Sequence, residues 1–263
     1  MIVITGATGQ LGRQIVERLL ERVDASEVGV SVRDPAKAEG LGVRVRRGDY
    51  ADPESLREAF DAASQVLLVS APAIGEVALR QHRNAIEAAR AAGVERVVYT
   101  SHQNASPASA FAPGVDHAAT EALLGDGDLA LRNGFYASSA RMLLGEGDVV
   151  VPEDGPVSWT TREDLAEAAA IILAERLDVR APLTGGEALD FAALAELAGR
   201  TRVVCSDEDY VARLVERGAP EWQANLLLGM FVASRAGEFD VVDPTLERLL
   251  GRPPQTMRAV LGA

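Results

Sequence analysis

Lysine and cysteine are nearly absent from this chain of 263 residues, which contains one of each, Lys37 and Cys205. A single cysteine cannot close a disulfide within the chain, and its scarcity fits a reducing compartment. The net charge of -13 argues against a nucleic-acid partner, because phosphate binding needs clustered Lys and Arg. No apolar run is long enough to span a bilayer and no signal peptide precedes the first expected strand, so we expect a cytoplasmic protein without a membrane partner. No metal site is expected either.

The dinucleotide-binding pattern Gly-x-Gly-x-x-Gly is also missing. In its place, Gly6, Gly9 and Gly12 follow a short apolar strand, Ile2 to Thr5, and lead into an amphipathic helix from Gln10 to about Arg22. These glycines would permit, in turn, a tight turn, a close approach of the backbone to a pyrophosphate, and close packing of the helix on the strand. The free N–H groups at the helix start favour an anion. The pattern predicts a dinucleotide-binding turn, with a purely structural turn as the alternative.

Strand and helix patterns alternate through the first half of the chain, which predicts a Rossmann-type α/β fold with a doubly wound parallel sheet. The ligand of such a sheet lies at the carboxyl ends of the strands. We assign residues 1–136 to this NAD(P)-binding domain and residues 137–263 to a smaller C-terminal α/β lobe on the substrate side, with the helix at 161–175 packing back on the first domain. Further strands are expected at 27–33, 43–47, 65–70, 94–101 and 128–132, and short lobe strands at 149–151 and 203–205.

Arg33 ends the second expected strand, where a Rossmann fold meets the adenosine ribose. A guanidinium suits a 2′-phosphate by charge and by its bidentate geometry, so NADP(H) is favoured over NAD(H). Lys37 would add a second positive charge. Asp34 leaves NAD as the alternative cofactor, since its carboxylate would reach a ribose hydroxyl if the strand ended one residue later.

Other strand ends carry small or polar residues that suit a bound dinucleotide. Asp49 and Tyr50 follow the third strand and would hold the edge and face of the adenine, although Asp49 could equally cap the following turn. Ser70 and Ala71 follow the fourth strand and leave space for a ribose. His82 lies within the long helix expected at 76–92, and a structural role is favoured for it.

These features together resemble the NmrA-like, atypical short-chain dehydrogenase/reductase family, particularly its bacterial NAD(P)H:quinone oxidoreductases of the type 2 group. The resemblance covers most of residues 1–136 and becomes patchy beyond them. The matching stretches are 6–12, 32–38, 48–50, 82–84, 91–94, 99–101, His117 with Glu121, 131–136 and 160–164.

The resemblance implies an NADPH-binding domain, a smaller lobe and a substrate cleft between them. The pyrophosphate would be held by Gly6, Thr8, Gly9, Gln10 and Leu11, and the 2′-phosphate by Arg33. The ribose and nicotinamide would be lined by Ser70, Ala71, Thr100 and Ser101, whereas Asn133, Gly134 and Tyr136 would border the nicotinamide and the substrate.

One departure from the wider dehydrogenase pattern concerns catalysis. Alcohol-oxidising members use Tyr-x-x-x-Lys, in which the lysine lowers the tyrosine pKa, but here the corresponding segment is His117-Ala-Ala-Thr-Glu121. An acidic residue cannot replace that lysine, so alcohol oxidation by this relay is not expected. The segment between Met142 and Trp159 is also shorter than in the quinone reductases, which alters the pocket wall.

Reduction of a quinone does not require this relay, because the oxyanion formed from the quinone is far less basic than an alkoxide. His117 or His102 would donate the proton or a hydrogen bond, with solvent as the alternative. Asn133 and Tyr136 are further candidates beside the reacting centre.

Three functional hypotheses follow. The first is an NADPH-dependent oxidoreductase, monomeric or homodimeric, that acts on a small quinone-like or conjugated carbonyl acceptor. The second is a non-catalytic sensor of the NADP(H) redox state, of the kind known among NmrA-like proteins. The third is a reductase or isomerase of specialised metabolites.

Overall fold

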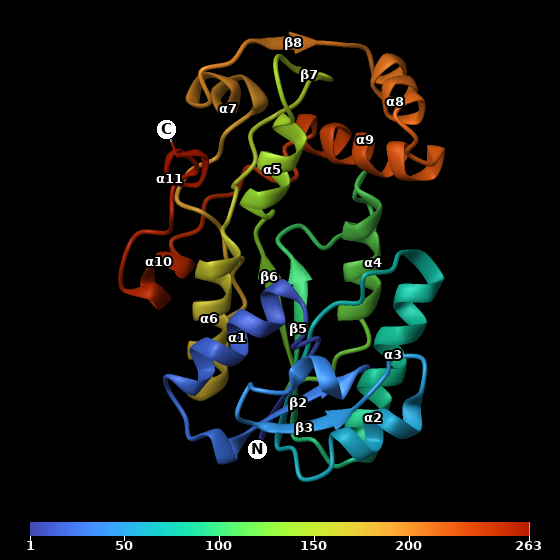
Figure 1. The fold of residues 1–263 in the computed structure, drawn as a ribbon, viewed down its shortest axis with the longest axis vertical. Helices are drawn as coiled ribbons and strands as arrows, with labels where there is room; N and C mark the ends of the chain where they lie inside the picture. Colours follow the sequence, from blue (N-terminus) through green and yellow to red (C-terminus); the bar gives the residue numbers. More distant parts are fainter. Residues whose placement is uncertain (263) are drawn as a thin grey trace.

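Six parallel strands form the central sheet of the protein, which a computed structural model describes for residues 1–262 (Figure 1). Their order is β3-β2-β1-β4-β5-β6, so the direction of the winding reverses between β1 and β4. This is the Rossmann order, and the predicted doubly wound parallel sheet is confirmed. The strands are β1 (Ile2–Thr5), β2 (Val28–Val32), β3 (Arg44–Arg47), β4 (Gln65–Leu68), β5 (Arg96–His102) and β6 (Leu129–Asn133).

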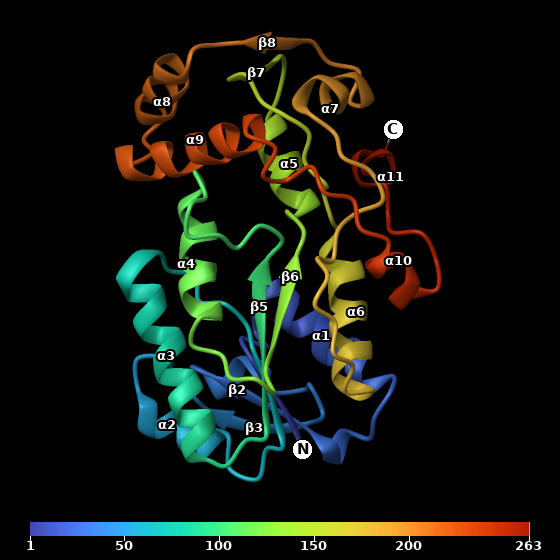
Figure 2. The same cartoon turned by 180° about the vertical axis from the view of Figure 1, so that it is seen from behind.

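Helices cover both faces of this sheet (Figures 1 and 2). The central strands therefore read as almost continuous apolar runs, because neither face meets water. One face carries α1 (Gln10–Leu20) and α6 (Arg162–Ala174), and the other carries α2 (Pro53–Ala59), α3 (Gly75–Ala91) and α4 (Ala112–Glu121). Two short 3-10 turns, η1 (Ala25–Glu27) and η2 (Pro35–Ala38), flank β2.

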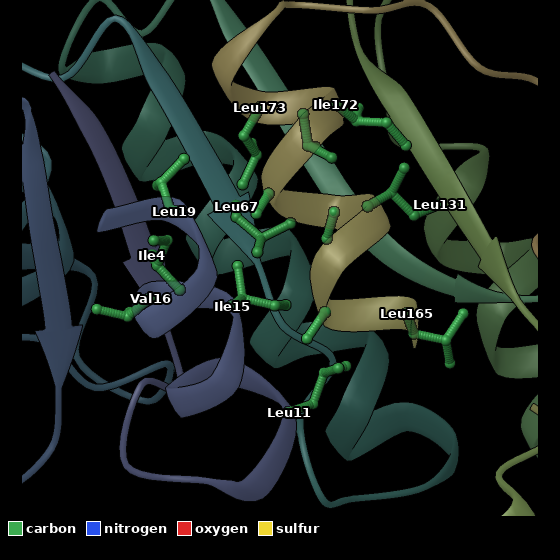
Figure 3. Close-up of a cluster of buried hydrophobic side chains, with 14 of the residues drawn as sticks. Ile4, Leu11, Ile15, Val16, Leu19, Leu67, Leu131, Leu165, Ile172 and Leu173 are labelled. Atoms are coloured by element: carbon green, nitrogen blue, oxygen red, sulfur yellow. The ribbon is translucent and has the colours of Figure 1, made fainter. Parts of the chain in front are cut away.

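Helices α1 and α6 lie side by side on the sheet, although 141 residues separate Leu20 from Arg162 by number (Figure 3). The buried stripe of α1 is Leu11, Ile15, Val16 and Leu19, which recur at helical spacing on one face. Helix α6 is apolar on nearly all sides from Leu165 to Leu173, as expected of a helix enclosed by the core. Burying one such Leu or Ile side chain contributes about 1.5–3 kcal/mol, so this shared core holds α6 firmly on the first domain.

The remaining C-terminal elements build a second core beyond the carboxyl ends of β5 and β6 (Figure 2). Its centre contains Trp159, Phe191, Phe231 and Phe239, all buried. Strands β7 (Val149–Val151) and β8 (Arg202–Val204) pair in parallel, within one residue of the ranges expected from sequence. The helices are α5 (Ala137–Leu144), α7 (Phe191–Leu197), α8 (Asp207–Glu216), α9 (Glu221–Arg235) and α11 (Met257–Leu261), while α10 (Thr245–Leu250) packs on α6.

The division of the chain between residues 136 and 137 stays a prediction. Helices α6 and α10 belong to the C-terminal part by sequence, but they pack into the core of the sheet domain. Within residues 1–262, no helix has both the length and the apolar character needed to cross a membrane.

Candidate functional site

The glycine turn after β1 is built by close backbone contacts. Gly6 adopts a φ of +62°, a conformation that favours glycine, and the Gly9 amide donates to the Gly6 carbonyl at 2.9 Å. A Cβ on Gly12 would lie 2.3 Å from that same carbonyl oxygen, so helix α1 approaches the turn more closely than any side chain would allow. Gly9 is the N-cap of α1 and offers no side chain to its free amides. The first turn of α1 therefore presents unpaired N–H groups of the kind that bind phosphate.

A groove of about 530 Å³ opens beside this turn, at the carboxyl ends of the strands where the winding reverses. Seven residues predicted to bind the cofactor line it, contributed by the loops after four strands. The lining residues are Thr5, Gly6, Thr8, Gly9, Ser31, Val32, Arg33, Gly48, Asp49, Tyr50, Val69, Ser70, Pro72, Ala73 and Gln81.

Arg33 and Asp34, the two residues that would choose between NADP and NAD, have different environments. Arg33 is exposed in the groove and forms no ion pair or side-chain hydrogen bond within residues 1–262. Asp34 instead caps η2 by accepting from the Ala36 amide at 3.3 Å, and it lies 3.8 Å from the ammonium of Lys37. Lys37 is largely exposed and is not among the residues that line the groove. A free guanidinium thus lies in the groove, while the competing carboxylate is engaged elsewhere.

Ser31 is a groove residue that sequence reasoning missed. Its hydroxyl oxygen is buried and has no hydrogen-bond partner among residues 1–262, although it lines the groove close to Gly48. An unpaired buried hydroxyl costs free energy unless a ligand or water satisfies it. The polar lining and the free amides of α1 fit an adenine dinucleotide. The only sign of Ser31 as a groove residue in the sequence was its place as a serine in the otherwise apolar strand Val28–Val32.

Asp49 and Tyr50 line the groove after β3, the strand that pairs with β2. Asp49 accepts from the Ala51 amide at 2.9 Å and therefore does cap its turn, while it also lines the groove. The Tyr50 hydroxyl donates to the Val69 carbonyl at 2.6 Å and lies 2.5 Å from Thr5 Oγ1. Burial raises the pKa of Tyr50 well above its ordinary value. This phenol hydroxyl is therefore a fixed structural group, while Tyr50 also lines the groove.

The other residues predicted to bind cofactor have varied surroundings. Thr100 accepts from the Ser70 amide at 2.9 Å, so its hydroxyl already supports the turn after β4. Ser101 donates to Glu121 at 2.5 Å. Gln10 lies in the first turn of α1 and lines a neighbouring groove, together with Arg162. The assignment of all these residues to the cofactor stays a prediction, both for those that line the groove and for Gln10, Leu11, Lys37, Ala71, Thr100 and Ser101, which do not.

Asn133 is the last residue of β6, and Gly134 and Tyr136 belong to the segment that joins this strand to α5. Asn133 is buried, and a Cβ on Gly134 would lie 2.1 Å from Thr160 Oγ1, which explains a glycine here. The Arg162 guanidinium lies 4.3 Å from the centre of the Tyr136 ring. Burial raises the pKa of Tyr136, opposed by the charge of Arg162 and a hydrogen bond with Asn133.

His102 and His117 lie together where the sheet domain meets the lobe. Their rings stack with centroids 6.1 Å apart, and His117 Nδ1 lies 2.7 Å from the Tyr99 hydroxyl. Phe111, Phe135 and Phe239 surround His102 at centroid distances of 5.2–5.8 Å. Burial lowers the pKa of His117 to about 4, and burial together with the neighbouring His117 lowers that of His102 to about 3. Both imidazoles are therefore neutral at pH 7.

Glu121 ends the segment that replaces Tyr-x-x-x-Lys, and it is bound in an ion pair. Its carboxylate accepts two hydrogen bonds from the Arg132 guanidinium, at 3.0 and 2.6 Å. The Ser101 hydroxyl supplies a third. The tyrosine and the lysine of the relay are thus replaced by His117 and Glu121. Glu121 joins α4 to β5 and β6.

Comparison with known proteins identifies the family. Residues 6–130 match a family model described as NAD(P)H-binding. The chain is 37% identical to quinone oxidoreductase 2 of Escherichia coli over 279 residues, which cover 98% of this chain and 96% of that protein. It is 30% identical to an NmrA-like family domain-containing oxidoreductase of Aspergillus flavus, over 95% of this chain and 90% of that one. The chain belongs to the NmrA-like, NAD(P)H-binding family of oxidoreductases.

A solved structure of this NmrA-like family matches along the whole chain. It is the crystal structure of an Escherichia coli NADPH-dependent quinone oxidoreductase complexed with NADPH, similar to this chain with a TM-score of 0.91 and 35% identity over 100% of this chain and 99% of that one. The predicted family and its NAD(P)H-binding domain are thereby confirmed. Within residues 1–262, His, Cys, Asp and Glu side chains form no group of three or more that could hold a metal ion.

Proposed function

We propose that this NmrA-like oxidoreductase reduces quinone-like or other conjugated carbonyl acceptors with NADPH, which it binds in preference to NADH. The observation that carries the acceptor class is the ion pair of Glu121 with Arg132, in the segment where alcohol-oxidising relatives place the lysine of their proton relay. The quinone oxidoreductases among its relatives support the same acceptor class.

The charge that forms on the acceptor explains why a quinone needs no such relay. Hydride delivery to a quinone creates a phenolate-like oxyanion whose conjugate acid has a pKa of about 10. The corresponding value for an alkoxide is near that of water, about 15.7. A difference of roughly 5.7 units at 1.36 kcal/mol each leaves about 7 to 8 kcal/mol less for the protein to stabilise. Positioning of the acceptor can then supply much of the remaining catalysis.

Preference for NADPH rests on the different environments of Arg33 and Asp34. Arg33 lies in the groove without a side-chain partner in residues 1–262 and would meet a 2′-phosphate, whereas the carboxylate that would select a 2′-hydroxyl caps η2. Ser31 would offer its unpaired hydroxyl at the same end of the groove. The amides at the start of α1 would hold the pyrophosphate, with Gly6, Thr8 and Gly9 beside them. When bound, NADPH supplies the hydride.

His117 would act on the acceptor as a neutral hydrogen-bond donor. With its pKa lowered to about 4, its imidazole carries no standing positive charge at pH 7. If Tyr99 donates to Nδ1, the proton of His117 is on Nε2, which is then the group offered to an oxyanion. The final proton would come from solvent. Asn133 and Tyr136 would border the acceptor from the loop after β6.

The test is consumption of NADPH by the purified protein, followed by absorbance across a panel of benzoquinones, naphthoquinones, enones and simple aliphatic ketones. We expect turnover with quinones and none with simple ketones. Tight binding of NADPH without consumption by any acceptor would overturn the proposal. That outcome, with similar affinities for NADP⁺ and NADPH, would favour the alternative of a redox sensor of NmrA type.

A further inference from the structure

Three successive amides follow β4, and each donates to a side chain instead of to another strand. Thr5 Oγ1 accepts from Val69, Thr100 Oγ1 from Ser70, and His82 Nε2 from Ala71, each at 2.9 Å. This segment leaves the sheet where the winding reverses, and Val69, Ser70, Pro72 and Ala73 line the groove. Its path along the groove therefore depends on side chains from β1, β5 and α3.

The hydrogen bonds of His82 assign a role to each of its ring nitrogens. A backbone amide can only donate, so Nε2 must be unprotonated where it accepts from Ala71. Nδ1 therefore carries the proton and donates to Thr120 Oγ1 of α4 at 2.9 Å. The Thr120 hydroxyl donates in turn to the Asp116 carbonyl at 2.9 Å. His82 is 2% exposed, and this chain of bonds leaves it one orientation and one tautomer.

Asn84, on the same helix, holds the groove segment that follows β3. Its side-chain amide donates to the Tyr50 carbonyl at 2.9 Å. The hydroxyl of Tyr50 in turn donates to the Val69 carbonyl at 2.6 Å, which joins the segment after β3 to the segment after β4. Gln81, the residue before His82, lines the groove directly, whereas His82 and Asn84 are not among its lining residues.

We propose that His82 and Asn84 are positioning residues for the dinucleotide, which hold two of the segments that line its groove through the backbone of Ala71 and Tyr50. This inference rests on the proposed placement of NADPH in the groove. His82 and Asn84 thereby acquire a role in cofactor binding although neither lines the groove. The effect is expected mainly on affinity for the cofactor, since both side chains bond to the backbone of segments that line the groove.

Arg83 supplies the matched control, because it lies between the two residues on α3 and is exposed without a side-chain partner in the described chain. His82→Leu removes the acceptor for the Ala71 amide, whereas His82→Gln keeps a carbonyl oxygen at a similar reach. Asn84→Asp keeps the shape of the side chain and replaces the donor facing the Tyr50 carbonyl with an acceptor.

The experiment measures the Kd of NADPH by titration calorimetry without any acceptor, on variants whose urea unfolding shows them to be folded at the assay temperature. We expect His82→Leu and Asn84→Asp to raise the Kd about tenfold, the equivalent of one hydrogen bond. His82→Gln should recover most of the affinity, and Arg83→Ala should leave it unchanged. In steady state, the KM for NADPH should rise in the two weakened variants while kcat stays close to the native value.

Folded His82→Leu and Asn84→Asp proteins with the native Kd would overturn the inference and leave both residues with a structural role only. The same outcome follows if His82→Gln binds no better than His82→Leu. The Arg33→Ala variant distinguishes a wrong positioning role for His82 and Asn84 from a wrong placement of NADPH in the groove. If Arg33→Ala weakens NADPH binding while the α3 variants do not, only the positioning role is lost; if none of them weakens it, the placement itself is wrong.

Discussion

Glu121 of α4 and Arg132 of β6 form a two-hydrogen-bond ion pair, with Oε1 to Nε and Oε2 to Nη2 distances of 3.0 and 2.6 Å. Ser101 donates to the same carboxylate from β5. The carboxylate thus ties a helix to two neighbouring strands just before the loop that carries Asn133. A lysine at position 121, as in the alcohol-oxidising pattern, would face a guanidinium in a partly buried site.

Glu121→Lys should therefore fail to create a tyrosine–lysine relay and should destabilise the protein. Reversing one charge leaves Arg132 and the new ammonium in repulsion and removes the acceptor for Ser101, a loss of about 1–3 kcal/mol in the free energy of unfolding. Urea denaturation measures this loss, and reduction of simple ketones should stay undetectable. Glu121→Gln, which keeps the shape and one acceptor oxygen, is the control and should lose less. Gain of ketone reduction in Glu121→Lys would contradict the assignment.

Arg33→Asp should shift cofactor preference from NADPH toward NADH. The substitution removes a charge-assisted contact to the 2′-phosphate and places a carboxylate there, which should weaken NADPH binding about 10- to 100-fold. The ratio of kcat/KM for the two cofactors measures the change. Lys37→Ala is the comparison, with a small expected effect because that ammonium is largely exposed beside Asp34. An unaltered cofactor ratio in Arg33→Asp would refute the role given to Arg33.

His117→Gln and Tyr99→Phe should both slow turnover with quinones without changing the Kd of NADPH. A neutral hydrogen bond to the acceptor accounts for about a tenfold effect on kcat, less than the hundredfold or more typical of a general acid. Tyr99→Phe removes the hydroxyl that lies 2.7 Å from His117 Nδ1 and so frees the imidazole to turn. Stopped-flow measurement of the hydride-transfer rate distinguishes this effect from product release. Native rates in both variants would show that His117 makes no hydrogen bond that assists reduction of the acceptor.

Gly12→Ala should destabilise the glycine turn. Alanine normally stabilises a helix relative to glycine, but here its Cβ would lie 2.3 Å from the Gly6 carbonyl oxygen, and backbone must move. The expected loss is about 1–3 kcal/mol in the free energy of unfolding, with weaker NADPH binding. Gly127→Ala provides the matched change, because its Cβ would meet only the Glu95 carbonyl, at 3.9 Å. Equal stabilities for the two variants would show that α1 does not need this close approach.

Stability should fall as the pH is lowered from 7 toward 4. Burial lowers the pKa of His82 to about 4, well under the usual value of 6.5, so between these pH values the unfolded chain binds a proton that the folded chain does not. The free energy of unfolding therefore rises with pH through this window, and His82 accounts for up to about 3 kcal/mol of the change. His102 and His117 act in the same direction. Urea titrations at several pH values measure the slope, which should be shallower in His82→Gln than in Arg83→Ala.

Much of the sheet domain was predictable because its signals are local. The apolar runs of β1, β2 and β4 are those of strands covered on both faces, and the glycines and the cap residues Asp52 and Thr161 mark where helices begin. Helices α4 and α5 were not predicted, because Pro113 and Gly114 occupy the first turn of one and the other has only eight residues. Both helices are held by packing against neighbouring elements instead of by their own pattern.

The order of strands and helices, the glycine turn and the basic residue after β2 all follow from local sequence, since each depends on neighbours within a few positions. Which polar groups are free depends instead on how distant segments pack together. This packing engaged Asp34 as a cap, paired Glu121 with Arg132, and gave Arg33 and the Ser31 hydroxyl no partner among the residues that the structure describes. It also made His82 an acceptor for Ala71. Whether a side chain is available depends on hydrogen bonds between segments far apart in the chain, and no local pattern records those bonds.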